Sequence, residues 1–201
     1  MQIQQTTDRA AIDWQSFNIG SNAQVTFAQP SASSIALNRV LGQEASQIYG
    51  HLQANGQVFL LNANGVMFAP SASVDVGGLL ASTRNLKNED FLADRLTLSG
   101  DGNGQVVNQG DISALHGGYV ALVGAQVINE GAIHAEQGAV HLAAADQVTL
   151  KIDGAGLTGL TVDRGTLNAL ASNKGLIKAD GGRIYLTAEA LDHVARAVVN
   201  N

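Results

Sequence analysis

The sequence predicts an all-β fold, a parallel β-solenoid in which short strands stack as successive coils. Three observations favour this fold class. Residue types recur at one long fixed spacing, apolar and polar residues alternate within short stretches, and a glycine separates consecutive stretches. A single coil of this kind cannot bury its inward side chains, so each coil must stack on the next to be stable.

The repeat is clearest in the second half of the chain. The pattern Asn, Gly, Ile, Ala, Gly, Val, Leu in residues 129–142 returns 44 residues later, in residues 173–186, with every spacing kept and isoleucine in place of valine. It also occurs 20 to 21 residues earlier, in residues 108–122, with one extra residue in the turn. Residues 50–60 are a partial fourth copy. The spacing predicts about nine or ten coils of about 20 residues, ~4.8 Å apart, and the 44-residue step is interpreted as two coils.

Each copy contains two short strands separated by a corner. Ile133 and Ala135 alternate with polar neighbours, as do Val140 and Leu142, which is the period of two expected of strands with one buried face. Gly138 lies between the two pairs and is expected to supply the positive φ of a sharp turn. An antiparallel sandwich or barrel also contains short strands and glycine turns, and it remains the alternative fold class.

One charged stretch interrupts the repeat. Residues 83–97 (TRNLKNEDFLADRLT) are expected to leave the solenoid as a short helix or an extra hairpin. Asn88 would cap the helix, with two acidic residues in its first turn. Phe91 and Leu92 would then pack against the solenoid.

A second interruption is expected at residues 153–168, which are rich in glycine and threonine and are interpreted as an irregular insertion. A chain of 201 residues fits one domain, or one segment of a longer repetitive protein. We treat residues 1–201 as a single β-helix domain.

The composition excludes several functional classes. The net charge is −6, and the chain has no cluster of lysine and arginine, so neither a nucleic acid nor an anionic membrane is an expected partner. No apolar run approaches the roughly 18 residues that a membrane-spanning helix needs. The first residues show neither a basic nor an apolar region, so no secretory signal peptide is expected within this chain. The chain has no cysteine and therefore no disulfide.

The sequence shows no pattern typical of catalysis or metal binding. The five histidines form no H-x-x-x-H pair, and no G-x-S-x-G sequence occurs. The glycine-rich residues 100–104 lack the further residues of a calcium or phosphate loop and are interpreted as a turn. Parallel β-helices include polysaccharide-cleaving enzymes, but the carboxylates of Asp8 and Asp13 do not repeat on neighbouring coils. We therefore expect no catalytic residue, no metal and no cofactor, and a protein that is not an enzyme.

The first half of the chain carries a more specific pattern. It reads DRAAIDWQSFNIG (8–20), VTFAQPSASSIALNRVLG (25–42), SQIYGHLQANGQVFLLNANGVMFAP (46–70) and VDVGGLLAST (74–83), followed by NEDFLADR (88–95). This order of segments resembles the N-terminal two-partner secretion domain of the filamentous haemagglutinin family. Beyond about residue 100, the likeness is only to repetitive coils.

The resemblance implies a right-handed parallel β-helix and a role in export. It implies the N-terminal module of a large adhesin or toxin that is secreted, or displayed on the cell surface, by a Gram-negative bacterium after crossing the periplasm. Its partners would be the POTRA domains of an Omp85-type outer-membrane transporter and the downstream passenger of the same polypeptide. The module would be a monomer and would seed folding of the β-helix outside the cell. The alternatives are an adhesin segment that binds host glycan or protein directly, and a β-helical carbohydrate-active enzyme.

The resemblance also implies candidate recognition residues. The family's N-P-N-G-I motif aligns with Asn62, Ala63, Asn64, Gly65 and Val66, so alanine stands here where the family has proline.

Three residues near the start of the chain are a second candidate site. Trp14, Phe17 and Asn18 are expected in the first coil or its cap, where they would pack and contribute to recognition.

Overall fold

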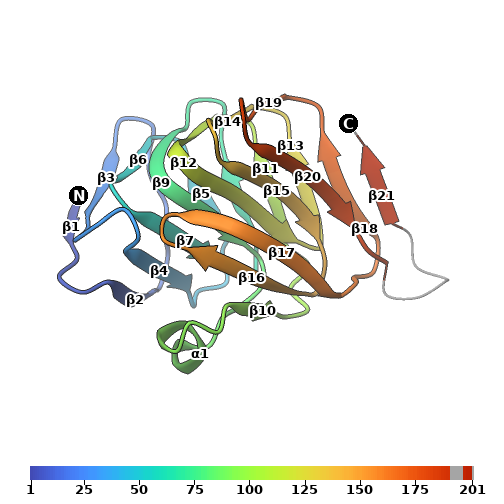
Figure 1. The fold of residues 1–201 in the computed structure, drawn as a ribbon, viewed down its shortest axis with the longest axis horizontal. Helices are drawn as coiled ribbons and strands as arrows, with labels where there is room; N and C mark the ends of the chain where they lie inside the picture. Colours follow the sequence, from blue (N-terminus) through green and yellow to red (C-terminus); the bar gives the residue numbers. More distant parts are fainter. Residues whose placement is uncertain (191–196, 201) are drawn as a thin grey trace.

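The computed structural model describes residues 1–190 and 197–200, and these fold into twenty-one strands and one short helix. The strands stack from the N-terminal to the C-terminal end of the molecule, and each coil contributes to three sides of a parallel β-helix (Figure 1). The all-β, parallel β-helix class is therefore confirmed. No helix of the described residues is long and apolar enough to cross a membrane.

The three sides are defined by strand pairing. The first side consists of β1 (Gln2–Gln4), β3 (Gln24–Ala28), β6 (His51–Ala54), the starts of β9 (Ser73–Ser82) and β12 (Asp111–Gly124), β14 (Ala132–Ala135) and β19 (Leu176–Lys178). The second side consists of β2 (Arg9–Trp14), β4 (Ile35–Val40), β7 (Gln57–Leu61), the ends of β9 and β12, β15 (Ala139–Ala144) and β20 (Arg183–Ala188). The third side consists of β5 (Ser46–Ile48), β8 (Val66–Phe68), β11 (Gln105–Asn108), β13 (Gln126–Asn129), β18 (Ala169–Asn173) and β21 (Ala197–Asn200).

The register of the strands matches the sequence repeat, with one correction. Ile112 pairs with Ile133, and Ile133 pairs directly with Ile177. The 44-residue step is thus one coil with a long insertion, and the interpretation as two coils was wrong. The first side holds seven strands among the described residues, fewer than the nine or ten coils predicted, because insertions and longer early coils use the remaining residues.

The repeating glycines serve close packing between coils. None of the three corner glycines, Gly118, Gly138 and Gly182, has a positive φ. The prediction of positive φ at these corners was therefore wrong. A Cβ on Gly138 would overlap the carbonyl oxygen of Gly118, and a Cβ on Gly182 would overlap that of Gly138. Glycine is needed at this position because the backbone of each coil passes against the backbone of the coil before it.

Aliphatic side chains form continuous columns inside the solenoid. On the second side, Val58, Leu79, Val120 and Val140 are paired in register, and each is completely buried. Each such side chain contributes about 1.5–3 kcal/mol by leaving water. Small branched residues suit this role because identical shapes stack at the short spacing between coils.

Asparagines form a second kind of column on the third side. Asn108 Nδ2 donates to Asn129 Oδ1 at 2.8 Å, and Asn129 Nδ2 donates to Asn173 Oδ1 at 2.7 Å. Asn108 and Asn129 are completely buried. The ladder satisfies amide groups that would otherwise be costly to bury, so it fixes the register of this corner.

The second side is apolar on its outer face as well. Phe59, Leu80, Ala121 and Val123 point outward and are completely buried by an outer layer. That layer contains α1 (Asn88–Leu92) and an antiparallel outer sheet made of β10 (Thr97–Ser99), β16 (Gln147–Asp153) and β17 (Gly156–Arg164), all of which lie on one flank in Figure 1.

The expected excursion at residues 83–97 contains α1. Phe91 packs inward with its ring 6.3 Å from that of Phe59, but Leu92 is 62% exposed, so the prediction that Leu92 packs down was wrong. Lys87 occupies the N-cap position, and Asn88 is the first helical residue, so Asn88 does not cap the helix. Its side chain accepts a hydrogen bond from Arg39 of β4 instead.

Arg9 of β2 also holds α1 against the first coils. Its guanidinium pairs with Asp94, donates to the Phe91 carbonyl oxygen at 2.8 Å and lies 5.1 Å from the centre of the Phe91 ring. Ion pairing, hydrogen bonding and a cation–π contact therefore act together at one end of the helix.

Residues 153–168, expected to form an irregular insertion, lie largely in the hairpin of β16 and β17. The hairpin begins at Gln147 and its strands pair regularly, with two register shifts. Leu98 of β10 pairs with Val148, so segments about 50 residues apart in the chain form one sheet.

A buried arginine joins the bases of the two excursions. Arg84 Nε donates to the Ala145 carbonyl oxygen at 2.7 Å, and Nη1 donates to that of Gly102 at 2.6 Å. Nη2 pairs with Asp146 at 2.9 Å. Burial lowers the pKa of Arg84 below its ordinary value, and the charge of Asp146 opposes this effect. The guanidinium stays protonated in proteins and links three separate chain segments.

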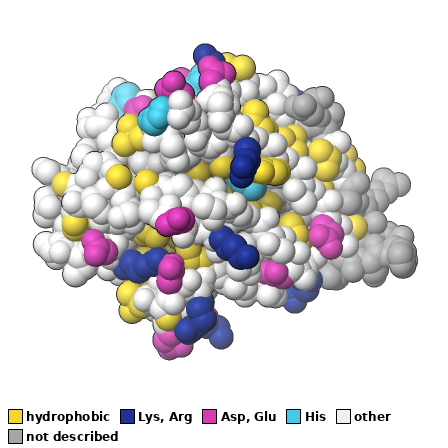
Figure 2. Space-filling view, viewed as in Figure 1, with side chains coloured by type: hydrophobic (Ala, Val, Ile, Leu, Met, Phe, Trp, Pro, Cys, Tyr) yellow, Lys and Arg dark blue, Asp and Glu magenta, His cyan; other side chains and the backbone are white. Residues whose placement is uncertain are grey.

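Charged side chains are sparse on the surface. On the face shown in Figure 2, lysines and arginines lie singly, several of them beside acidic side chains. This distribution is consistent with the short ion pairs of the first coils, such as Arg39 with Asp13 at 3.3 Å.

We predict that Gly138→Ala destabilises the fold by about 1–3 kcal/mol, because the added methyl group overlaps the neighbouring coil. Urea unfolding followed by circular dichroism measures the change. Gly20→Ala is the matched control, since a Cβ there meets nothing within 4 Å, and it should change stability by less than about 0.5 kcal/mol. Equal effects of the two substitutions would contradict close coil packing.

We predict that His141 makes the fold sensitive to acid. Its ring stacks on Tyr185 at 4.4 Å, and burial lowers the pKa of His141 from 6.5 to about 4. Between these two values the unfolded chain binds a proton that the folded chain does not, so stability falls as pH drops from about 6.5 to about 4. The stability of His141→Gln, measured across this range, should fall less steeply than that of the unmodified chain. Identical slopes for the two proteins would refute the prediction.

Candidate functional site

The residues that match the family motif form the corner between the second and third sides. Asn62 directly follows β7, and Val66 is the first residue of β8. The corner therefore connects two strands that are each paired to neighbouring coils.

Asn62 organises the corner from inside. Its side chain is buried, and its Nδ2 donates to the Glu44 carbonyl oxygen at 2.9 Å and to Ser46 Oγ at 3.0 Å. Its Oδ1 accepts the backbone N–H of Asn64 at 3.0 Å, and its carbonyl oxygen accepts that of Gly65 at 3.0 Å. These bonds define a turn that is held to the preceding coil, as asparagine commonly does.

Gly65 gives the corner its backbone conformation. Its φ of 124° lies in the region that favours glycine, and a Cβ there would lie 3.1 Å from the Gln105 carbonyl oxygen. On the next coil, a Cβ on Gly104 would overlap the backbone of Asn64 and Gly65. The turn is thus enclosed by the coils on both sides.

Two of the five motif residues face solvent. Ala63 and Asn64 are exposed, whereas Gly65 and Val66 are buried like Asn62. Asn64 Nδ2 donates to the Gly42 carbonyl oxygen at 2.9 Å, which orients its side chain on the surface. A partner of the folded domain would therefore contact Ala63 and Asn64 and not the rest of the motif.

A small hollow of about 230 Å³ adjoins these two residues. Its lining combines the exposed side of the corner with the outer end of β4 and the start of the first excursion, namely Arg39, Val40, Leu41, Gly42, Leu61, Asn62, Ala63, Asn64, Thr83, Arg84 and Asn85. Leu41 is 61% exposed, so the hollow has an apolar edge on the surface.

Trp14, Phe17 and Asn18 lie in the first coil, where the Trp14 carbonyl oxygen accepts the backbone N–H of Leu41 at 2.8 Å. The rings of Trp14 and Phe17 meet edge to face at 5.5 Å, and Trp14 Nε1 donates to Asn38 Oδ1 at 3.0 Å. Phe17 is buried, and Asn18 Oδ1 accepts the backbone N–H of Gln47 in β5 at 2.8 Å. Trp14 and Asn18 thus join the first coil to the next one, and Phe17 packs in its core.

Several residues that shape the corner were not identified from the sequence. Glu44 contributes only a backbone carbonyl oxygen, which leaves no sequence signal. Gly104 belongs to the glycine-rich residues 100–104, which were interpreted only as a turn. The close approach of Gly104 to the motif could have been inferred only from the alignment of coils.

Comparison with known proteins identifies the family. The model of the TPS secretion domain matches residues 1–201. A heme/hemopexin-binding protein of Haemophilus influenzae (strain ATCC 51907 / DSM 11121 / KW20 / Rd) is 38% identical over 206 residues, covering 94% of this chain and 21% of that protein. Another heme/hemopexin-binding protein of Haemophilus influenzae is 51% identical over 87 residues, covering 43% of this chain and 9% of that protein.

A solved structure agrees with this match. The secretion domain of HMW1 from Haemophilus influenzae superposes with a TM-score of 0.81 at 32% identity, covering 92% of this chain and 52% of that one. The chain thus spans about a fifth of the first relative and about half of the solved chain. These relatives are described as a secretion domain and as binding proteins, not as enzymes. The resemblance seen in the first half of the sequence is confirmed, and the chain belongs to the TPS secretion domain family, the two-partner secretion domains of exported proteins.

Proposed function

We propose that this chain is the secretion-signal module of a large exported protein, and that the POTRA domains of a cognate Omp85-type outer-membrane transporter recognise it. Membership of the TPS secretion domain family carries this proposal. The protein would cross the periplasm of a Gram-negative bacterium and be released or displayed outside the cell.

The motif corner is the part of the surface that we assign to recognition. Ala63 and Asn64 are exposed side by side on a turn whose remaining residues are buried. The turn keeps its shape through Asn62 and Gly65, so it does so without the proline that the family motif has in place of Ala63. A fixed, exposed pair of residues needs little ordering on binding, which favours affinity.

We also propose that the domain seeds the folding of the chain that follows it. In the last described coil, Ile184 is 45% exposed and Val199 is 52% exposed, although both lie in inward columns. Their counterparts one coil earlier, Val140 and Ala171, are completely buried. A further coil of the same polypeptide would bury Ile184 and Val199 and would pair with the edge of β19, β20 and β21 that no described strand occupies.

We predict that Asn64→Ala reduces transporter-dependent export about tenfold, which corresponds to about 1.4 kcal/mol of lost recognition. The measurement is the ratio of secreted to cell-associated protein in bacteria carrying the natural transporter. Asn22→Ala is the matched control, because Asn22 is also an exposed asparagine in a turn but lies at the corner before β3. Normal export of Asn64→Ala would contradict the assignment of the motif corner to recognition.

We predict that Asn62→Ala acts through stability. The substitution leaves the N–H of Asn64 and the carbonyl oxygen of Glu44 without their buried partner, at a cost of about 1–3 kcal/mol. Urea unfolding should show this loss, and Asn64→Ala should change stability by less than about 1 kcal/mol. Unchanged stability of Asn62→Ala would contradict the structural role of Asn62.

A further inference from the structure

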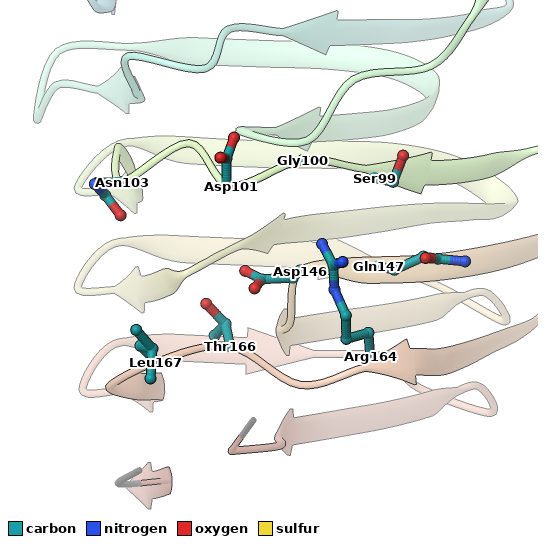
Figure 3. Close-up of a pocket in the computed structure, with 9 residues that line it drawn as sticks. All are labelled: Ser99, Gly100, Asp101, Asn103, Asp146, Gln147, Arg164, Thr166 and Leu167. Carbon is teal, nitrogen blue, oxygen red and sulfur yellow. The ribbon is translucent and has the colours of Figure 1, made fainter. Parts of the chain in front are cut away.

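A hollow of about 580 Å³ lies where the first excursion rejoins the solenoid and the second leaves and rejoins it. Its volume falls within the range of about 300–1,000 Å³ that is usual for ligand pockets. The lining comes from the end of β10 and the following turn, the start of β16, and the end of β17, and it consists of Ser99, Gly100, Asp101, Asn103, Asp146, Gln147, Arg164, Thr166 and Leu167 (Figure 3).

The polar side chains of this hollow differ from those elsewhere in the coils. Within residues 1–190 and 197–200, the side chains of Ser99, Asp101, Asn103, Gln147 and Arg164 have no hydrogen-bond or ion-pair partner. By contrast, the asparagines of the third side bond to one another in a ladder. The hollow therefore concentrates donors and acceptors that the fold itself does not use.

Thr166 is the most informative of these residues because it is only 4% exposed. Its backbone N–H donates to the Glu189 carbonyl oxygen at 2.8 Å, while its hydroxyl has no partner among the described residues. Figure 3 shows Thr166 and Arg164 beside the segment that carries Asp146. Although most of the residue is buried, its hydroxyl is accessible from the hollow and is free to bond to a ligand.

Charges around the hollow are balanced. Asp101 and Asp146 supply two carboxylates, Arg164 supplies one free guanidinium, and Arg84 lies behind Asp146 at 2.9 Å. An anion would meet the carboxylates and a cation would meet the guanidinium, so neither gains a clear advantage. The site instead suits a neutral ligand that offers donors and acceptors on adjacent atoms.

We propose that this hollow binds a neutral saccharide. Each sugar hydroxyl can donate to Asp146 or Asp101 while accepting from Arg164, and Thr166 can complete either kind of hydrogen bond. Leu167 is 59% exposed at the edge and would pack against the C–H face of the ring. The hollow contains none of the motif residues, although Gly104, next to Asn103, lies against the turn of Asn64 and Gly65.

The test is a titration of the isotope-labelled chain of residues 1–201 with the methyl glycosides of glucose, galactose and mannose, followed by amide NMR shifts. At least one glycoside should shift amides of residues 99–103, 146–147 and 164–167 in a saturable manner. Thr166→Val should weaken that binding at least tenfold. Thr161→Val, which removes an exposed hydroxyl from β17, should leave it unchanged.

Arg164→Gln provides a second variant, since Arg164 is exposed and its replacement does not disturb the core. It should also weaken binding at least tenfold. The proposal is overturned if no neutral glycoside shifts these amides, if only phosphate or acidic glycans do so, or if binding requires calcium. Export of Thr166→Val should be normal, so failure of saccharide binding leaves the export proposal untouched.

Discussion

In-register stacking of successive coils is the constraint on which the rest of the structure depends. The columns of aliphatic residues, represented by Leu52, Val74, Ile112 and Ile133, are buried only because each coil covers the next. The same stacking aligns the asparagine ladder, and it brings backbones so close at the corners that only glycine fits there. This packing also fixes the shape of the motif corner, because Asn62 bonds to the preceding coil and Gly104 of the next coil lies against the turn.

Two excursions complete the structure by covering the outer face of the second side. The outer sheet joins β10 to β16, so it cannot form until both segments are in place. Arg84 reinforces this closure because its guanidinium bonds to the bases of both excursions. Breaking a buried pair of this kind by removing one partner typically costs about 3–5 kcal/mol. The domain is therefore not a simple sum of coils, although each coil contacts mainly its neighbours.

The sequence predicted the features that depend on local pattern. The alternation around Ile133 and the recurrence of Asn129 were sufficient for the strands, their parallel pairing and most of the register. The length of the 44-residue step was misread, since no local signal shows that β16 and β17 pair with β10. The continuous apolar run of β7 did carry a signal of burial on both faces. At the motif corner, the resemblance supplied the residues, but the division between buried Asn62 and exposed Asn64 depends on backbone partners that the sequence does not reveal.

Native-state hydrogen exchange tests the central claim, that solenoid and outer sheet form one cooperative unit. The relevant amides are those of Leu80 in the middle of the second side and Leu150 in the outer sheet, whose N–H donates to the Leu96 carbonyl oxygen at 3.0 Å. Both amides should exchange with the free energy of global unfolding, and Arg84→Met should lower this free energy by the same amount at both. The claim would be contradicted if Leu150 exchanged with a much smaller free energy of opening than Leu80, and if Arg84→Met left the exchange of Leu80 unchanged.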